Sequence, residues 1–200
     1  VRIMPKFILY ACPVGPLADQ IQAFLDQSRA RFGPNAAHGY MPHCTLTGFF
    51  SDDPAVVPGD LQRLDRLLAR ALPAGPRPAV RVTGWGAQPG WLGLELESPW
   101  LCGLARDFAA SANGGSRQTP VKAKSWLHLT LANDFPWRQQ APLAALARQM
   151  VDPAAAVSWE LRYYQRDPGG CWRCHRAWGV PAMLPGTLDG SGSPGRTRGG

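Results

Sequence analysis

Apolar residues recur along the chain at two spacings, one typical of amphipathic helices and the other of strands. The helical spacing predicts helices over 17–32, 60–72, 98–108 and 142–150. Segments rich in β-branched and aromatic residues predict strands over 7–11, 43–50, 80–85, 91–97, 127–132, 157–165 and 171–180. Turn-prone sequences at 88–90 and 167–170 separate neighbouring strands, and Gly84-Trp85-Gly86 is also interpreted as a turn. The chain is therefore predicted to be a mixed α and β protein.

The order of these elements repeats. Each half of the chain is predicted to contain a helix, a strand, a second helix and two further strands, over about 5–97 and 98–180. A tandem duplication is the simplest explanation, and we expect 1–185 to form a single domain of two interleaved lobes. The remaining residues, 186–200, are mainly Gly, Ser and Arg, a composition typical of a disordered tail.

Each repeat carries the same tetrapeptide pattern, His-x-Thr-Leu, in the predicted strand between its two helices. The two copies are His43-Cys44-Thr45-Leu46 and His128-Leu129-Thr130-Leu131, in a chain with four histidines. Alternate side chains of a strand point to the same face. The histidine and threonine of each copy therefore share one face, while the leucines can anchor the opposite face in the core. A single such motif is more often structural, whereas two copies at equivalent positions favour catalysis.

Two imidazoles and two hydroxyls that converge in one cleft suit acid–base chemistry at phosphorus. Imidazole titrates near neutrality, so one ring can act as a neutral base while the other acts as a protonated acid. Threonine hydroxyls can donate hydrogen bonds to phosphoryl oxygens as negative charge develops on them. A hydrolytic triad fits less well, because no serine or carboxylate accompanies the histidines at a fixed spacing. The set predicts cleavage of a phosphodiester without a metal or other cofactor.

Composition indicates which kind of ligand and which cellular location would suit this chemistry. The formal net charge of +7 suits a phosphorylated or polyanionic ligand, although an arginine-rich composition typical of GC-rich genomes would account for the charge equally well. No segment approaches the roughly 20 apolar residues needed to span a bilayer. Five cysteines, an odd number, and the absence of a recognisable export signal predict reduced thiols and a cytoplasmic location.

The paired motifs resemble those of the 2H phosphoesterase superfamily, which includes 2'-5' RNA ligase-like proteins and cyclic nucleotide phosphodiesterases. The resemblance covers about 6–180 and implies a bilobal α+β fold, with two antiparallel sheets facing a central pseudo-twofold cleft and helices outside. It also implies that His43 and His128 are the catalytic pair and that Thr45 and Thr130 hold the phosphate. By analogy with the cyclic phosphodiesterases, His128 is expected to activate water and His43 to protonate the leaving oxygen, with the reverse direction left open.

The resemblance implies a monomeric enzyme that opens a 2',3'-cyclic phosphate. The substrate could be an RNA end, a cyclic nucleotide or an ADP-ribose cyclic phosphate, and the sequence does not choose among them. Cleavage or joining of 2'-5' linkages is an enzymatic alternative. A non-catalytic module that binds RNA ends is an alternative of another class, motivated by the basic charge and the tryptophans.

Three further residues are candidates for substrate binding. Lys124 and Trp126 precede the second histidine by four and two residues, so they would face the cleft if the strand began that early. Lys124 could then contribute charge and Trp126 could stack on a base or sugar. Tyr40, in the loop before the first motif, is a weaker stacking candidate. For Lys124 and Trp126 the alternative is that neither binds substrate, with Trp126 packed at the rim and Lys124 solvated. His38, in the same loop as Tyr40, is interpreted as solvated.

A competing signal lies near the end of the chain. Cys171-Trp172-Arg173-Cys174-His175 matches the attachment sequence of c-type haem. Haem attachment normally takes place outside the cytoplasm and at a helix start, whereas this segment alternates like a strand. A zinc site would need further ligands, and the other cysteines are scattered. A chance match within a terminal hairpin is the preferred interpretation.

Overall fold

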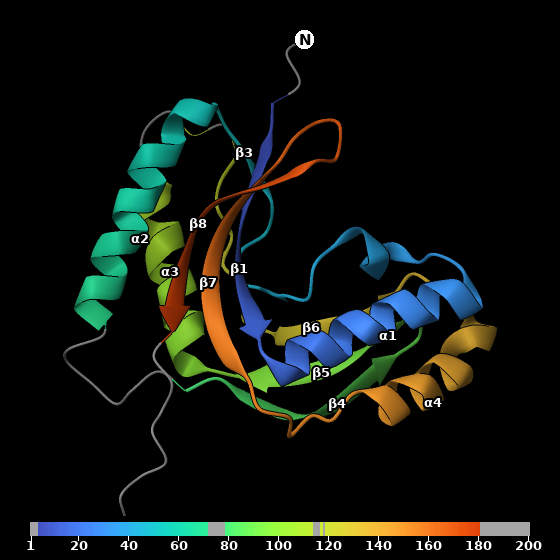
Figure 1. Cartoon of the computed structure of the whole chain (residues 1–200). Helices are drawn as coiled ribbons and strands as arrows, with labels where there is room; N and C mark the ends of the chain where they lie inside the picture. Colours follow the sequence, from blue (N-terminus) through green and yellow to red (C-terminus); the bar gives the residue numbers. More distant parts are fainter. Residues whose placement is uncertain (1–3, 72–78, 114–116, 118, 181–200) are drawn as a thin grey trace, which may run out of the picture.

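The computed structural model describes residues 4–71, 79–113, 117 and 119–180, so the predicted tail at 186–200 lies outside the described residues. Within these ranges the chain is an α+β protein, as the sequence predicts (Figure 1). Its α-helices are α1 (Pro16–Phe32), α2 (Val57–Ala71), α3 (Pro99–Ala112) and α4 (Gln140–Met150). Its strands are β1 (Lys6–Val14), β2 (Cys44–Thr45), β3 (Phe50–Ser51), β4 (Arg81–Gln88), β5 (Trp91–Glu97), β6 (Leu127–Asn133), β7 (Ser158–Arg166) and β8 (Trp172–Val180).

The strands form one hydrogen-bonded sheet in the order β4-β5-β6-β2-β1-β7-β8, with β3 paired to β1. The expectation of two separate sheets is therefore wrong for the described residues. The physical reason lies in β2, a strand of two residues whose backbone is shared by both neighbours. Its Thr45 pairs with Tyr10 of β1, and its Cys44 pairs with Leu129 of β6. This short strand joins the two halves of the sheet into one network.

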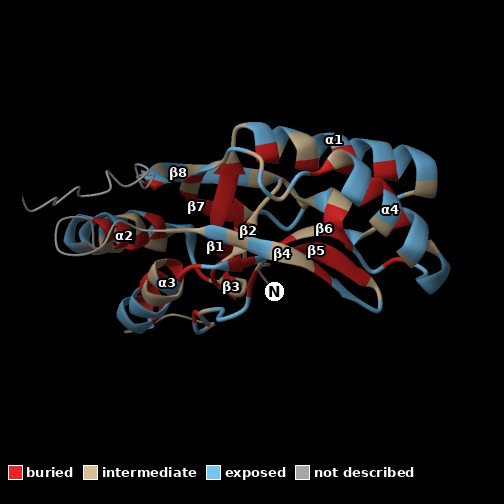
Figure 2. Ribbon diagram, turned by 90° about the horizontal axis from the view of Figure 1, so that it is seen from below, coloured by how far each residue is buried: buried red, intermediate tan, exposed pale blue. Residues whose placement is uncertain are grey.

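The two repeats exchange their hairpins. The β4–β5 hairpin of the first repeat adds to β6 of the second, whereas the β7–β8 hairpin of the second repeat adds to β1 of the first. Helix α1 packs with α4, and α2 packs with α3, so the helices form two pairs at the two ends of the sheet (Figures 1 and 2). Each half of the sheet is thus built from both halves of the chain.

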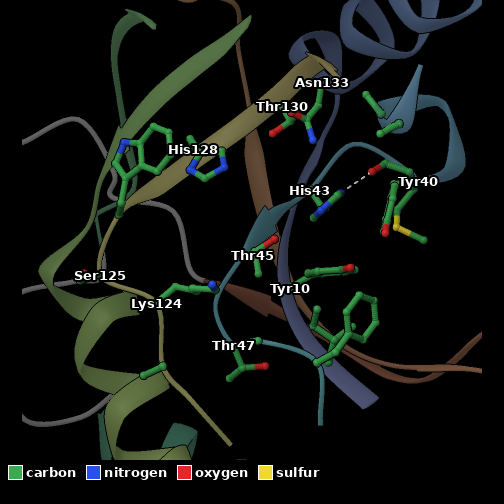
Figure 3. Close-up of a pocket in the computed structure, with 18 of the residues that line it drawn as sticks. Tyr10, Tyr40, His43, Thr45, Thr47, Lys124, Ser125, His128, Thr130 and Asn133 are labelled. Atoms are coloured by element: carbon green, nitrogen blue, oxygen red, sulfur yellow. Dashed lines mark hydrogen bonds between the residues drawn. The ribbon is translucent and has the colours of Figure 1, made fainter. Parts of the chain in front are cut away.

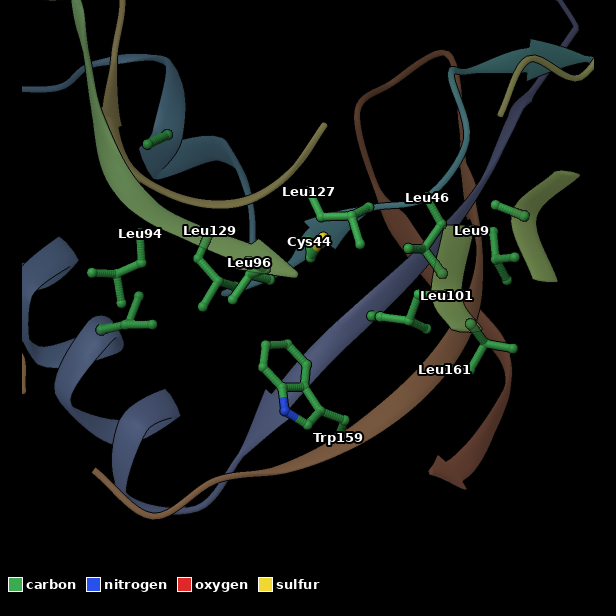
Figure 4. Packing of buried hydrophobic residues seen from close by; sticks show 14 of the residues in the cluster. Leu9, Cys44, Leu46, Leu94, Leu96, Leu101, Leu127, Leu129, Trp159 and Leu161 are labelled. Atoms are coloured by element: carbon green, nitrogen blue, oxygen red, sulfur yellow. The ribbon is translucent and has the colours of Figure 1, made fainter. Parts of the chain in front are cut away.

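Alternation along the motif strands places the leucines in the core, as predicted. Leu127, Leu129 and Leu131 of β6 are buried, and Leu46 has no exposed surface. Figure 4 shows Leu127 and Leu129 packed in one apolar cluster with Leu46 and Cys44. Burial of these side chains fixes which face of each strand is turned away from the core, and that face carries the histidines and threonines.

The 43–50 segment differs from the single strand that its composition predicts. Only β2 and β3 are regular, and the residues between them follow an irregular path. Thr47 forms an isolated bridge with Ala123, and its Oγ1 accepts a hydrogen bond from the backbone N–H of Leu9 at 3.1 Å. The side chain of Thr47 thus replaces a ladder hydrogen bond, which lets the backbone leave the sheet between β2 and β3.

A second difference concerns Gly84-Trp85-Gly86, which lies inside β4 and is not a turn. The chain turns at Pro89-Gly90, where Gly90 has φ 75°, a conformation that favours glycine. Gly84 marks a break in the β4–β5 register, so it acts as an irregularity within the strand.

Candidate active site

Both His-x-Thr motifs open into one pocket of about 640 Å³ (Figure 3). His43 and Thr45 reach it from β2 and the residue before that strand, and His128 and Thr130 reach it from β6. Its other walls come from β1, from the loop after α1 and from 123–126. The side chains that the sequence predicts to converge are therefore neighbours in one cavity, at the seam between the two halves of the sheet.

The central residues of the two motifs explain this convergence. Cys44 and Leu129 are antiparallel partners. Extending this register by one residue in one direction places His43 opposite Thr130. Extending it in the other direction places Thr45 opposite His128. Residues directly opposite in an antiparallel pair have Cβ atoms about 4.5–5.5 Å apart. The site is thus a compact quartet in which two His/Thr pairs are crossed.

His43 is held in one tautomer by its own chain. Its Nδ1 lies 2.7 Å from the backbone oxygen of Met41. A carbonyl oxygen only accepts, so Nδ1–H is the donor and the neutral ring keeps a lone pair on Nε2. Tyr10 and Tyr40 flank the ring at centroid distances of 4.1 and 5.4 Å. Burial lowers the pKa of His43 to about 4. The carbonyl of Met41 favours the charged ring and opposes this shift, but its effect is smaller.

His128 lies in a matching aromatic setting, but it is held differently. Trp126 stacks against its ring at 4.0 Å, and Trp91 meets it edge-on at 5.2 Å. Burial lowers the pKa of His128, and the positive charge of Lys124 acts in the same direction. The backbone carbonyl of Trp126 favours the charged ring, but Nδ1 makes no hydrogen bond of good geometry with any described residue. Its tautomer is therefore not fixed by a backbone contact like that of His43.

The two motif threonines are not equivalent. Thr130 Oγ1 accepts a hydrogen bond from the indole N–H of Trp91 at 3.1 Å. The side chain of Thr45 makes no hydrogen bond within the described part of the chain and points into the pocket in Figure 3. Both hydroxyls keep a hydrogen that can be donated to a phosphate oxygen.

All three secondary candidates line the pocket. Lys124 directs its ammonium group towards its centre (Figure 3), Trp126 is 46% exposed at the rim, and Tyr40 forms part of the opposite wall. Lys124 is the one cation among the described lining residues, and no carboxylate is found among them. The pocket therefore suits a ligand that carries a single negative charge.

Other lining or supporting residues were missed by the sequence analysis, chiefly Tyr10, Trp91 and Met41. Tyr10 lies opposite Thr45 in the β1–β2 register, and the carbonyl of Met41 orients His43. The sequence pattern predicted helix α1 and the loop that follows it, but it did not reveal which distant strands are neighbours. Strand register is the signal that would have found Tyr10.

His38 serves the fold and does not line the pocket. The backbone N–H of Asn35 donates to its Nδ1 at 2.9 Å, so the neutral ring carries its proton on Nε2 and donates to Ser28 Oγ at 3.0 Å. Ser28 in turn donates to the carbonyl of Leu25. The polarity of this Ser–His pair is the reverse of what an activated serine requires, and the ring instead caps the loop after α1.

The haem-like sequence lies at the β7–β8 hairpin. Cys171 precedes β8, while Cys174 and His175 lie within it, and His175 Nε2 is 2.9 Å from Gln165 Oε1. Within the described ranges no three histidine, cysteine or acidic side chains gather closely enough to hold a metal ion. The same residues include no helix with the length and apolarity needed to cross a membrane.

Comparisons with known proteins extend over most of the chain, although no family model matches it. It is 30% identical over 168 residues to the ecdysteroid-phosphate phosphatase of Bombyx mori, which covers 82% of this chain and 25% of that protein. It is 31% identical over 168 residues to ubiquitin-associated and SH3 domain-containing protein A of Mus musculus, again over 82% of this chain and 26% of the relative.

A likeness in structure is found to E. coli LigT complexed with ATP, with 17% identity and a TM-score of 0.44 over 90% of this chain and all of LigT. The chain spans about a quarter of the length of the two curated relatives just named. The two sequence similarities therefore match the chain to one segment of longer proteins.

Proposed function

We propose that this chain is a 2H-type phosphoesterase that hydrolyses 2',3'-cyclic phosphates by paired histidine acid–base catalysis. The observation that supports the proposal most strongly is the crossing of two His/Thr pairs at the β2–β6 seam, inside a pocket whose described lining has one cation. Two rings and two hydroxyls in this arrangement can contact the phosphorus centre from both sides. RNA ends, cyclic nucleotides and ADP-ribose cyclic phosphates all carry the cyclic phosphodiester and are the candidate substrates.

In the proposed reaction one histidine removes a proton from water as the oxygen attacks phosphorus. The bond from phosphorus to one ribose oxygen breaks, and the second histidine donates a proton to that oxygen. A phosphate monoester and a free hydroxyl result, and water supplies both the oxygen and the net proton. Thr45, Thr130 and Lys124 stabilise the charge that grows on the non-bridging oxygens.

For the direction of proton transfer we propose His128 as the base and His43 as the acid. His43 is neutral in the free protein because burial lowers its pKa to about 4. A phosphate placed beside the ring favours the charged form, so the substrate itself would raise this pKa and load the acid. Within the described residues the ring of His128 is not held by a backbone carbonyl like that of His43, and this ring would receive the water proton.

The charge of the pocket favours a diester over a monoester. A cyclic phosphodiester carries one negative charge, which Lys124 alone can balance, whereas a phosphate monoester carries about two near neutral pH. We therefore propose that the phosphatase activity named for the Bombyx mori relative is not the activity of this pocket.

The decisive experiment assays purified protein, with EDTA present, on a panel of cyclic phosphates, 2'-5' dinucleotides and a phosphate monoester. Turnover of a cyclic phosphate is expected, with a loss of about a thousandfold in His43→Ala and in His128→Ala. Retained turnover in both variants would exclude the proposal. Cleavage of 2'-5' linkages alone would favour the ligase-like alternative, and RNA affinity without any product would favour a binding module.

A further inference from the structure

Trp91, the first residue of β5, lies beside the second motif and is not among the residues that line the pocket. Its indole N–H donates to Thr130 Oγ1 at 3.1 Å, and its ring meets His128 edge-on, with the two planes 87° apart. Trp126 packs on the same indole at 5.0 Å. One buried side chain of β5 thus contacts both members of the second motif without lining the pocket.

Two glycines make room for this indole. Gly86 of β4 and Gly93 of β5 are paired across the hairpin, and Gly93 lies two residues from Trp91, on the same face. A Cβ at Gly93 would lie 2.6 Å from Cζ2 of the indole and 2.3 Å from the backbone oxygen of Leu129, and one at Gly86 would lie 2.7 Å from Cζ3.

Neither glycine adopts a positive φ. Gly86 and Gly93 are therefore needed for the space they leave and not for their backbone conformation, and together they form the floor on which the indole of Trp91 lies.

The hydrogen bond restricts what the Thr130 hydroxyl can do. A hydroxyl has one hydrogen to donate and two lone pairs that accept. Because the indole N–H occupies one lone pair, the oxygen is held in place and its hydrogen remains available to the pocket. Thr45 has no such restraint among the described residues, so the two crossed pairs differ in how firmly their hydroxyls are held.

We propose that Trp91 is a positioning residue that fixes the Thr130 hydroxyl and the His128 ring for catalysis, and that Gly86 and Gly93 exist to admit its indole. The inference rests on the proposed phosphoesterase function and deepens it, because it names how one half of the site is pre-organised. Trp91 acts through Thr130 and His128 and is not expected to touch the substrate.

The test uses Trp91→Phe, which keeps an aromatic ring and removes the N–H. With a 2',3'-cyclic nucleotide as substrate, kcat should fall about tenfold while KM changes little, since the lost contact orients a group used in the transition state. Trp159→Phe is the matched control, because Trp159 is buried and its indole N–H has no partner among the described residues. This control should keep its kcat.

Two double-mutant cycles separate positioning from a general loss of stability. Trp91→Phe should have little further effect in a Thr130→Val background, because the hydroxyl it positions is gone. Gly86→Ala should lower kcat when Trp91 is present but not in the Trp91→Phe background, since phenylalanine lacks Cζ3 and Cη2, the atoms that the new methyl group meets. Gly103→Ala, with open space around the glycine in α3, is the control for Gly86→Ala.

Each outcome decides one question. An unchanged kcat in Trp91→Phe, together with inactive His128→Ala, would overturn the inference and leave the proposed function standing. Full activity in His128→Ala would remove the proposed function itself. Additive effects of Trp91→Phe and Thr130→Val would show that the tryptophan does not act through the threonine. Should Trp91→Phe fold poorly, Gly86→Ala in folded protein gives the same decision.

Discussion

The Nδ1 atom of His43 lies 2.7 Å from the carbonyl oxygen of Met41, two residues earlier in the chain. This contact leaves Nε2 as the free nitrogen of a buried, neutral ring. The corresponding Nδ1 of His128 has no hydrogen-bond partner among the described residues. The two copies of one tetrapeptide thus hold their imidazole rings differently, one by a backbone carbonyl and the other by aromatic packing alone.

The first prediction concerns the pH dependence of kcat/KM. Burial lowers the pKa of His43 to about 4. Burial, and to a smaller extent the positive charge of Lys124, lowers the pKa of His128 from its usual value of 6.5. One ring must be protonated and the other neutral, so kcat/KM should rise through the lower pKa and fall through the higher one. A bell-shaped profile with its maximum between about pH 4 and 6.5 is expected from initial rates at low substrate concentration. A maximum above pH 7 would contradict it.

A second prediction assigns the two histidine roles through the leaving group. A nitrophenyl phosphodiester expels a stable anion and does not need a protonated leaving oxygen, whereas a ribose oxygen does. The variant that lacks the acid should therefore lose far less activity on the nitrophenyl ester than on a cyclic nucleotide. We expect this pattern for His43→Ala and not for His128→Ala. The opposite pattern would reverse the two roles.

The third prediction separates catalytic from structural threonines. Thr45→Val and Thr130→Val should each lower kcat about 100-fold, because each removes a donor to the developing charge. Thr47→Val is the contrasting variant, since its Oγ1 accepts from the buried N–H of Leu9. This change should lower the free energy of unfolding by about 1–3 kcal/mol and leave kcat within a few fold. Steady-state rates and urea denaturation of the three variants provide the comparison.

Lys124 supports a fourth prediction. Lys124→Met should raise KM for a cyclic phosphate about tenfold and reduce its dependence on salt, because the balancing charge is lost. It should also raise the pKa of His128, and so move the limb of the kcat/KM profile that this ring controls to higher pH, since Lys124 lowers that pKa. Lys122→Met is the matched control, as Lys122 does not line the pocket. Equal effects of the two variants would show that only net charge matters.

The fifth prediction concerns a buried ionic network whose residues do not line the pocket. Asp60 is fully buried and accepts from Arg63, Arg117 and Tyr163 at 3.0, 2.6 and 2.8 Å. Asp60→Ala leaves the buried Arg117 without its closest partner and should destabilise the fold by about 3–5 kcal/mol. Asp65→Ala breaks an exposed pair and should change the unfolding free energy by less than about 1 kcal/mol. Urea denaturation curves measure both, and similar midpoints would refute the expectation.

Local spacing predicted the elements well because periodicity is a property of the sequence itself. The 91–97 strand and the long helix after β1 match their predicted positions closely. Alternation also placed Leu127 and Leu129 in the core and the motif histidines on the opposite face. The predicted convergence of the motifs followed from this alternation and from the duplicated element order.

Contacts between distant strands could not be predicted in this way. Whether the strands make one sheet or two depends on Cys44, which pairs with a residue 85 positions later. The Trp91 to Thr130 hydrogen bond depends on a shifted β5–β6 register that composition does not reveal. The hydrogen bond from the backbone N–H of Leu9 to Thr47 Oγ1 likewise accompanies an irregular segment where a strand was predicted. In each case the result depends on a contact between residues that are far apart in the sequence.

The exchange of hairpins between the repeats has a consequence for folding. Strand β1 is paired along its whole length with β7, from Lys6 with Arg166 to Val14 with Ser158, so β1 waits for a partner strand that is synthesised much later. Pairings of such long sequence separation slow folding, because a large loop must close before they form. A nascent chain that has emerged only as far as β6 carries both histidines but lacks the strand that holds β1 in place. Catalytic competence should therefore arise in a single late step, when the last hairpin docks.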